Sequence, residues 1–353
     1  MTQMLKVGIA GHGMVGKRRH SFINKHREMK VIAASDQNYT ISKTKLDQCA
    51  IYSDFRALLD NESIDVLFVC LPNDVAAEAT IAGLKKGCHV FCEKPPGRNV
   101  QEVQSVIDVE NKYPNLKLKY GFNHRYHDSV RQAINMVREK RLGRVVNLRG
   151  VYGKSVITPE VKDIEDINHP VYWRAHRKHA GGGILLDQGI HMVDLMRCFG
   201  GEFVDIKSFI SNEFWQRDVE DNAYALMRSE EGVVAMLHSS ATQWQHRFSL
   251  EITLEKGSLI LAGILSSTKS YGQETLTIYE CKQKTNGMPN ETIRNYNKDN
   301  SWAEEVSDFK ECILRNKPIT VGTSLDAYKT MELVYKIYVA DSEWSARYGI
   351  SIK

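Results

Sequence analysis

The sequence lacks the long hydrophobic runs that a membrane span requires. No window of the 353 residues approaches the roughly 18 apolar residues of a transmembrane helix. The opening residues, Met1 to Lys6, lead directly into a strand pattern, without the charged and apolar regions of a secretory signal. We therefore expect a cytoplasmic protein that does not associate with a membrane.

Paired cysteines are also missing. The seven cysteines are dispersed, none forms a CxxC pair, and several lie inside apolar runs. This usage indicates buried thiols in a reducing cytoplasm rather than a disulfide framework. Zinc-ligand spacing is absent as well, so the sequence predicts no metal site.

The chain has little excess charge of either sign. Its 47 basic and 43 acidic residues leave a formal charge of +4. The basic residues are scattered, and the short run Lys17–His20 is interpreted as the solvated start of a helix, so no nucleic-acid partner is expected. With 42% hydrophobic residues, the chain is typical of a soluble globular protein, and its length fits two domains.

The first third of the chain alternates short apolar runs with helical patterns. Predicted strands are 7–10, 31–34, 66–71 and 89–92, and predicted helices are 17–25, 75–86, 101–113 and 129–140. Continuous apolar runs separated by helices are typical of βαβ units in a parallel sheet. We therefore predict an α/β fold whose residues 1–122 form a Rossmann domain with a doubly wound parallel sheet.

The pattern of apolar runs changes after Gly143. Strand-like runs cover 145–151, 204–210, 223–227, 233–239, 248–254, 258–261 and 276–279, and helical patterns cover 185–199, 302–315 and 325–344. Runs of strands predict an α+β domain at 123–353, built on a large, mainly antiparallel, open-faced sheet, with last helices able to pack on the Rossmann domain. An uncovered sheet face favours a homodimer or homotetramer through that sheet.

A glycine motif follows the first predicted strand. Gly11-His12-Gly13-Met14-Val15-Gly16 fits GxGxxG and opens a helix, as in dinucleotide-binding folds. Gly11 permits the tight turn, Gly13 lets the backbone approach a pyrophosphate, and Gly16 lets the helix pack on the strand. The alternative is a glycine-rich turn that binds nothing.

Four further positions, in two segments, are predicted to contact the cofactor. Asp36 ends the second strand, where a carboxylate accepts hydrogen bonds from the adenosine ribose. No arginine follows it, which favours NAD over NADP, although Lys43 could approach a 2′-phosphate; a simple turn role for Asp36 is the alternative. Leu71-Pro72-Asn73 follows the third strand at the edge where such sheets bind ligands.

Two segments predict catalysis. Glu93-Lys94-Pro95 follows a core strand, and a partly desolvated lysine there can polarise a hydroxyl or handle a proton. Gly181-Gly182-Gly183 precedes Asp187 and His191, whose spacing predicts one helix face able to orient a hydroxyl and remove its proton. The alternatives are a solvated loop lysine, a surface pair and part of a metal site.

With these motifs, the whole chain resembles the glucose-fructose oxidoreductase/inositol dehydrogenase/MocA family. The resemblance also rests on Asn123-His124-Arg125-Tyr126 and on the late helix near Trp302. It implies that Lys94 contacts nicotinamide and substrate, and that Asp187 and His191 flank the reacting carbon. The expected cofactor contacts also include Glu93 and His124. The expected substrate contacts also include Asn123, Arg125, Tyr126, Trp173 and Arg174.

The resemblance implies an oxidoreductase that exchanges a hydride between NAD and a ring hydroxyl of a sugar. The stretch from Asp218 to Gly263, which contains Ser239–Trp244, looks like that of family members encoded with bacterial surface-polysaccharide genes. Arg174 and Arg177 are expected either to bind the phosphates of a substrate or to lie on the surface of a loop. The hypothesis is therefore a nucleotide-linked sugar as substrate. Alternatives are a free-sugar or inositol dehydrogenase, an NAD-dependent glycosidase and a non-catalytic dinucleotide sensor.

Overall fold

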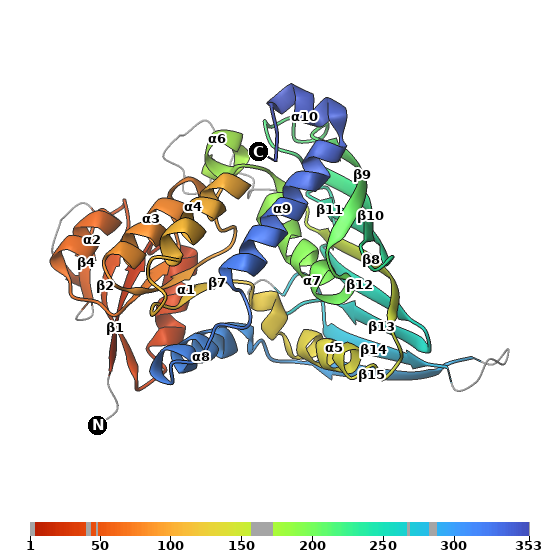
Figure 1. The fold of residues 1–353 in the computed structure, drawn as a ribbon, viewed down its shortest axis with the longest axis horizontal. Helices are drawn as coiled ribbons and strands as arrows, with labels where there is room; N and C mark the ends of the chain where they lie inside the picture. Colours follow the sequence, from red (N-terminus) through yellow and green to blue (C-terminus); the bar gives the residue numbers. More distant parts are fainter. Residues whose placement is uncertain are drawn as a thin grey trace. The chain divides into compact units, whose positions relative to one another are not determined.

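The chain divides into two compact units in the computed structural model (Figure 1). The structure describes residues 4–39, 44–46, 49–156, 172–266, 269–281 and 288–352. Residues 1–123 and 302–328 form the first unit, and residues 124–301 and 329–353 form the second. Within the described ranges, no helix is long and apolar enough to cross a membrane.

A seven-stranded sheet in the order β3-β4-β2-β1-β5-β6-β7 organises the first unit. All neighbouring strands are parallel except β3 and β4. The strands are β1 (Leu5–Ala10), β2 (Met29–Ser35), β3 (Thr44–Leu46), β4 (Cys49–Tyr52), β5 (Val66–Val69), β6 (His89–Cys92) and β7 (Leu118–Tyr120). The chain order reverses between β1 and β5, which is where doubly wound sheets bind ligands.

Five helices accompany this sheet. They are α1 (Met14–Ile23), α2 (Phe55–Asn61), α3 (Asn73–Lys85), α4 (Val100–Glu110) and, from much later in the chain, α8 (Ser301–Leu314). Val306 and Phe309 of α8 join the buried core formed by β1, β2, β5 and β6. The ring of Phe309 meets those of Phe68 and Phe91 edge-on. This apolar contact explains why the late helix returns to the first unit.

The second unit contains an eight-stranded sheet in the order β15-β14-β13-β12-β8-β11-β10-β9. Only β8 and β11 are parallel neighbours. The strands are β8 (Val145–Gly153), β9 (Phe203–Ser211), β10 (Asn222–Ser229), β11 (Val234–Ser240), β12 (Arg247–Leu254), β13 (Gly257–Ala262), β14 (Glu274–Glu280) and β15 (Asn290–Tyr296). The predicted α/β fold with a large, mainly antiparallel second sheet is confirmed.

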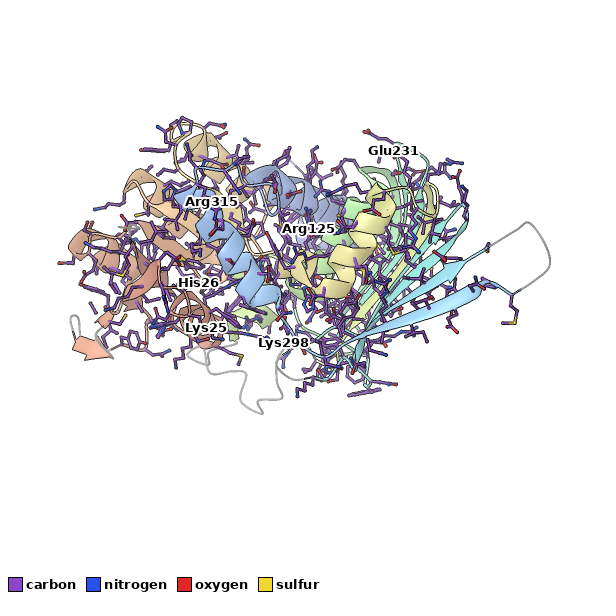
Figure 2. The ribbon with its side chains drawn as sticks, turned by 90° about the horizontal axis from the view of Figure 1, so that it is seen from below. Lys25, His26, Arg125, Glu231, Lys298 and Arg315 are labelled. Carbon is purple, nitrogen blue, oxygen red and sulfur yellow. The ribbon has the colours of Figure 1, made fainter. Side chains whose placement is uncertain are left out.

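Helices cover one face of this sheet. Helix α5 (Asp128–Arg138) packs on β13 to β15, and α7 (Ile190–Gly200) packs on β8 and β11. The second unit also holds α6 (Arg177–Ala180), most of α9 (Ser324–Ala340), α10 (Ser342–Tyr348) and the short helices η1 (Asn123–Tyr126), η2 (Tyr172–Ala175) and η3 (Leu185–Gly189). Figure 2 shows the side chains along these elements, with Glu231 in the turn between β10 and β11.

The exposure pattern of the central strands leaves the other face open. Along β10, Ala223, Ala225 and Met227 are buried, whereas Tyr224 and Leu226 are exposed. Period-two alternation of this kind places one set of side chains in the core and the other in solvent. The exposed set on β10 therefore includes two apolar side chains, Tyr224 and Leu226.

Several elements differ from the sequence-based expectation. The strands β4, β7 and β15 were not predicted, because β4 and β7 span only four and three residues and β15 is polar and exposed. The helix expected at 325–344 is two helices, since Asp341 caps a new helix through the amide of Trp344. The helix expected at 185–199 begins with the π-helical turn η3.

The basic run at the start of α1 also requires a correction. Its interpretation as a solvated helix start is wrong for Arg19, whose side chain is fully buried. Arg19 Nε lies 2.6 Å from Glu93 Oε1, and its Nη2 lies 2.6 Å from Glu305 Oε2 on α8. Pairing of this kind is what allows a guanidinium to be buried.

Candidate active site

The glycine motif forms a tight turn between β1 and α1. Gly11 has φ +88°, and a Cβ there would lie 2.3 Å from the carbonyl oxygen of Cys70. A Cβ on Gly16 would lie 1.9 Å from the carbonyl oxygen of Gly11. At Gly13, by contrast, a Cβ would meet no described atom within 4 Å. The motif therefore keeps its backbone accessible at Gly13, just before the first amides of α1, which suits a phosphate.

Asp36 lies beside this turn at the end of β2. Its Oδ2 accepts a hydrogen bond from the amide of His12 (3.1 Å), and its Oδ1 accepts from the amide of Asn38 (3.0 Å). The His12 ring lies 2.6 Å from the Tyr39 hydroxyl and 3.0 Å from His20 Nδ1. Burial, together with His20 and Lys17, lowers the pKa of His12 to about 4, so its imidazole is neutral at neutral pH.

The remaining cofactor candidates of the first unit follow the carboxyl ends of β1, β5 and β6. Leu71 and Pro72 lead into α3, whose first residue, Asn73, is buried. Met14 and Val15 open α1, and Met14 is strongly exposed. These positions and the glycine turn follow adjacent strands of one sheet, where the fold binds a dinucleotide. The residues present therefore fit NAD.

Glu93, an expected cofactor contact, is held in place by the buried Arg19. Trp302 and Phe91 lie on the guanidinium, with Arg19 Cζ 4.2 Å and 4.5 Å from the two ring centroids. Burial and the nearby Glu93 raise the pKa of Glu305 to about 7, although Arg19 opposes this. The half-buried Lys94 follows Glu93 directly, so this cluster anchors the backbone from which Lys94 extends.

In the second unit, Asp187 lies on the π-helical turn η3. Turns of this type occur frequently at functional sites. Lys154 Nζ, at the end of β8, lies 3.0 Å from Asp187 Oδ2, and Arg174 Nε lies 3.7 Å from Asp187 Oδ1. The carboxylate is thus held in place by two cations from other elements while its side chain stays 19% exposed.

His191 follows on α7 and is stacked on His124. The two imidazole centroids are 3.7 Å apart with an interplanar angle of 13°. His124 Nε2 in turn lies 3.0 Å from the Tyr152 hydroxyl of β8. Burial raises the pKa of Tyr152, which keeps its phenol protonated. The structure therefore places His124, predicted to contact the cofactor, directly against a predicted catalytic residue.

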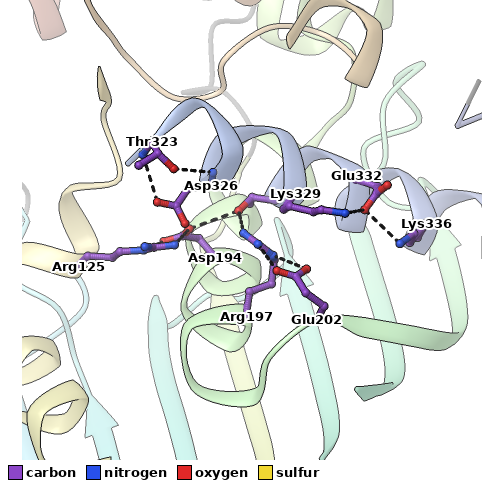
Figure 3. A network of polar contacts seen from close by, with 10 residues as sticks. Arg125, Asp194, Arg197, Glu202, Thr323, Asp326, Lys329, Glu332 and Lys336 are labelled. Carbon is purple, nitrogen blue, oxygen red and sulfur yellow. Dashed lines mark hydrogen bonds and ion pairs between the residues drawn. The ribbon is translucent and has the colours of Figure 1, made fainter. Parts of the chain in front are cut away.

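Arg125 makes a bidentate pair with Asp194 on α7 (Figure 3). Its Nε and Nη2 lie 2.7 and 2.6 Å from the carboxylate oxygens, and Thr330 of α9 donates to the same carboxylate. Arg197 joins through Thr330 and pairs with Glu202. This network ties η1, α7 and α9 together, so Arg125 has a structural partner in addition to its expected substrate contact. Its neighbours Asn123 and Tyr126 are both buried.

The triple glycine is explained by packing within the second unit. Gly181 has φ +81°, and Cβ atoms on Gly182 and Gly183 would collide with the Tyr338 hydroxyl and the Glu220 backbone. The buried carboxylate of Glu220 accepts from the amides of Gly183 (2.8 Å) and Leu185 (3.0 Å). The glycines therefore let the start of the Asp187 helix approach Glu220, which caps it.

The two arginines expected to meet phosphates have different environments. Arg174 lies over Trp173, with its Cζ 4.3 Å from the ring centroid, close to Asp187. The Arg177 side chain donates from Nε to the Asp218 carbonyl and from Nη1 to the Gly181 carbonyl, and it stacks on Tyr348. Arg177 is thereby engaged in holding its own helix.

Sequence reasoning did not identify Tyr152, Lys154, Gln188 or Tyr271 as site residues. Lys154 pairs with Asp187, and Gln188 Nε2 donates to the Tyr271 hydroxyl (3.0 Å). No local pattern relates Lys154 to Asp187, a residue 33 positions away. Lys43, which was considered as a contact for a 2′-phosphate, lies outside the described residues.

Comparison with known proteins places the chain in a family. The model described as oxidoreductase family, NAD-binding Rossmann fold, matches residues 5–122, and that of the GFO/IDH/MocA C-terminal domain matches residues 130–260. The chain belongs to the Gfo/Idh/MocA oxidoreductase family. The predicted family is confirmed. The first unit of the chain contains an NAD-binding Rossmann domain.

Individual members of the Gfo/Idh/MocA family show how far the likeness extends. Levoglucosan dehydrogenase of Pseudarthrobacter phenanthrenivorans is 29% identical over 65% of this chain and 60% of its own. D-glucoside 3-dehydrogenase of Escherichia coli is 29% identical over 60% of this chain and 58% of its own. A solved levoglucosan dehydrogenase in complex with NADH has the same fold, with a TM-score of 0.81 at 20% identity over 97% of this chain and 98% of that one.

Proposed function

We propose that this protein is an NAD-dependent dehydrogenase that interconverts a ring CH–OH and the corresponding ketone of a sugar. The observation that carries the proposal is the arrangement of Asp187 and His191. Asp187 is fixed by Lys154, and His191 is stacked on His124, in a chain whose other unit is an NAD-binding domain. A fixed carboxylate and an imidazole suit the orientation and deprotonation of a hydroxyl.

In oxidation, NAD supplies the acceptor for the hydride that leaves the carbon. His191 takes the proton of the reacting hydroxyl, and Asp187 accepts a hydrogen bond that orients the sugar. The ammonium of Lys94 donates to the reacting oxygen and stabilises negative charge that develops there. The carbon thus loses a hydride and the oxygen a proton, which together convert the alcohol to the ketone.

A sugar without a diphosphate fits the proposal better than a nucleotide-linked sugar. Diphosphate recognition was expected of Arg174 and Arg177, but Arg177 is engaged by Asp218 and Tyr348. Arg174 lies beside the carboxylate of Asp187, which would repel a phosphate. The two relatives identified by sequence are named for levoglucosan and a glucoside, which also supports an uncharged sugar.

The test is a substrate survey with purified protein. Free sugars, glycosides, inositols and nucleotide-linked hexoses are each offered with NAD, and formation of reduced cofactor is followed by absorbance. We expect reduction of NAD with an uncharged sugar. Product release without net cofactor reduction would identify a glycosidase instead, and NAD binding without turnover of any sugar would identify a dinucleotide sensor.

A further inference from the structure

A cavity of about 620 Å³ lies in the second unit between the connection that joins β11 to β12 and the ends of β13 and β14. Residues 242–249 form most of its wall, and Ala262, Gly263 and Tyr271 complete it. Small-molecule sites typically occupy about 300–1,000 Å³. Three of its lining residues, Thr242, Gln243 and Trp244, belong to the segment that the sequence analysis singled out and that the proposed chemistry does not use.

Some residues that line the cavity also contact neighbours of the candidate catalytic residues. The hydroxyl of Tyr271 accepts a hydrogen bond from Gln188, the neighbour of Asp187. The ring of Phe248 lies 5.2 Å from that of Tyr152 and 5.9 Å from that of His124, centroid to centroid. Two lining residues, Tyr271 and Phe248, therefore contact the neighbours of Asp187 and His191.

Backbone hydrogen bonds also connect the cavity lining to the residue that pairs with Asp187. The amide of Gln243 donates to the carbonyl of Lys154 (3.0 Å), and the ammonium of Lys154 reaches Asp187. The amide of Lys154 donates to the carbonyl of Ser240 (2.9 Å). Gln243, which lines the cavity, is thus bonded directly to the residue that fixes the candidate catalytic carboxylate.

The lining chemistry matches a sugar ring. Trp244 is 71% exposed, so its indole face is available to a ligand, and Tyr271 supplies a second aromatic ring. Gln243, Gln245 and Thr242 add amide and hydroxyl groups that can both donate and accept. Aromatic faces contact the C–H side of a sugar, while amides and hydroxyls bind its hydroxyl groups.

The charge of the lining favours an uncharged ligand. His246 is held by the hydroxyls of Ser155 (3.1 Å) and Ser270 (2.8 Å), and burial lowers its pKa, which keeps it neutral. Arg247 is the one permanent cation among the described lining residues, and none of these residues carries a carboxylate. A lone cation is a poor match for a diphosphate, which arginine clusters bind.

We propose that this cavity binds the second ring of a glycoside, so that the substrate is a disaccharide or aryl glycoside whose first ring reacts near Asp187 and His191. The inference rests on the proposed sugar dehydrogenase function. Trp244 and Tyr271 contact the faces of the second ring, and Gln243 binds its hydroxyls. Because these contacts are remote from the reacting carbon, they contribute to binding and orientation.

The experiment compares glucose, maltose, cellobiose and UDP-glucose as substrates of the wild type, Trp244→Ala and Trp244→Phe. We expect a disaccharide to exceed glucose in kcat/KM. Trp244→Ala should reduce that advantage on the order of tenfold, mainly through KM, as expected for loss of an aromatic contact. Trp244→Phe should retain most of it. Met288→Ala, an exposed apolar side chain outside the lining, should behave as the wild type.

Binding of the same compounds to the NADH-saturated protein is measured by calorimetry, which keeps the inference testable if turnover fails. Turnover of glucose with no advantage for either disaccharide, or an advantage unchanged in Trp244→Ala, overturns the inference and leaves the proposed function standing. Disaccharide binding that depends on Trp244 without turnover supports the cavity and refutes the dehydrogenase. If UDP-glucose is the ligand that Trp244→Ala loses, the occupant is a nucleoside and the inference is wrong.

Discussion

At the scale of single residues, Asp36 serves both the fold and the expected cofactor. Its two oxygens accept hydrogen bonds from the amides of His12 and Asn38 and so tie the glycine turn to the end of β2. The same carboxylate stands where the adenosine ribose is bound in dinucleotide folds. A 2′-phosphate at that position would meet its negative charge.

We predict that the protein binds NAD about ten- to a hundredfold more tightly than NADP, because repulsion by one carboxylate is worth that much. Asp36→Asn, which keeps the shape of the side chain and removes its charge, should reduce the difference between the affinities for NAD and NADP. Fluorescence titration with both reduced cofactors checks this. The exposed Asp108→Asn on α4 serves as the control, and equal affinities in the wild type would contradict the prediction.

His191 and Lys94 are expected to differ in what their loss changes. His191→Ala should lower kcat by about 10²–10⁴, the usual contribution of a proton-transfer group, while leaving NAD affinity nearly unchanged. Lys94→Ala should lower kcat and raise KM, because Lys94 is assigned to both chemistry and substrate. Steady-state kinetics and cofactor titration separate these effects, with His26→Ala as the control. Loss of NAD affinity with full turnover would remove either residue from the catalytic set.

At the scale of elements, buried carboxylates attach α8 and η3 to their units. The Arg19 guanidinium bridges Glu93 after β6 and Glu305 on α8. Glu220 caps the helix that carries Asp187 and also accepts a hydrogen bond from the Tyr338 hydroxyl of α9 (2.6 Å). Both sets of contacts hold the backbone beside a candidate catalytic residue, Lys94 in the first unit and Asp187 in the second.

Glu305 makes stability depend on pH. Its pKa is about 7 in the folded protein, raised from 4.5 by burial and by Glu93, while Arg19 and Lys119 oppose the rise. Between pH 4.5 and 7 the folded state therefore holds a proton that the unfolded state has released. The free energy of unfolding must fall as the pH rises through this window.

Glu305→Gln should reduce the decrease in the free energy of unfolding across this pH window, because the amide does not titrate and can still accept a hydrogen bond from Arg19. Urea unfolding of the wild type and the variant across this pH window measures the slopes. Glu304→Gln, an exposed neighbour on the same helix, should keep the wild-type slope. Parallel curves for Glu305→Gln and the wild type would show that Glu305 is ionised throughout.

At the scale of the whole molecule, the open face of the second sheet carries a group of exposed apolar side chains. Leu226 and Met236 are cross-strand partners on β10 and β11, and they are 55% and 43% exposed. Tyr224 stacks on His238 in the same face, with centroids 4.0 Å apart. Exposed apolar patches of this kind mark protein–protein contacts.

We predict that the protein self-associates through this face as a dimer or tetramer. The double substitution Leu226→Glu with Met236→Glu should produce a monomer, because a carboxylate buried without a partner opposes association. Light scattering coupled to size-exclusion chromatography measures the mass. Met288→Glu, which adds a charge outside the face, should leave it unchanged, and a monomeric wild type would contradict the prediction.

The dinucleotide unit could be predicted from the sequence because its determinants are local. Gly11, Gly13 and Gly16 act through the backbone of a single turn, and the apolar runs of β1, β2, β5 and β6 alternate with helices at regular intervals. Periodicity and spacing of this kind survive in the linear sequence. Asp187 and His191 were identified for the same reason, as neighbours on one helical segment.

Only the tertiary structure decided which distant side chains support these residues. Lys154 pairs with Asp187 across 33 residues, Glu220 caps Gly183 across 37, and Arg19 meets Glu305 across 286. Such pairs depend on how strands and helices pack, and no local pattern encodes them. A basic run therefore suggested a solvated helix start although Arg19 is buried, because burial of a charge depends on partners that folding brings from elsewhere in the chain.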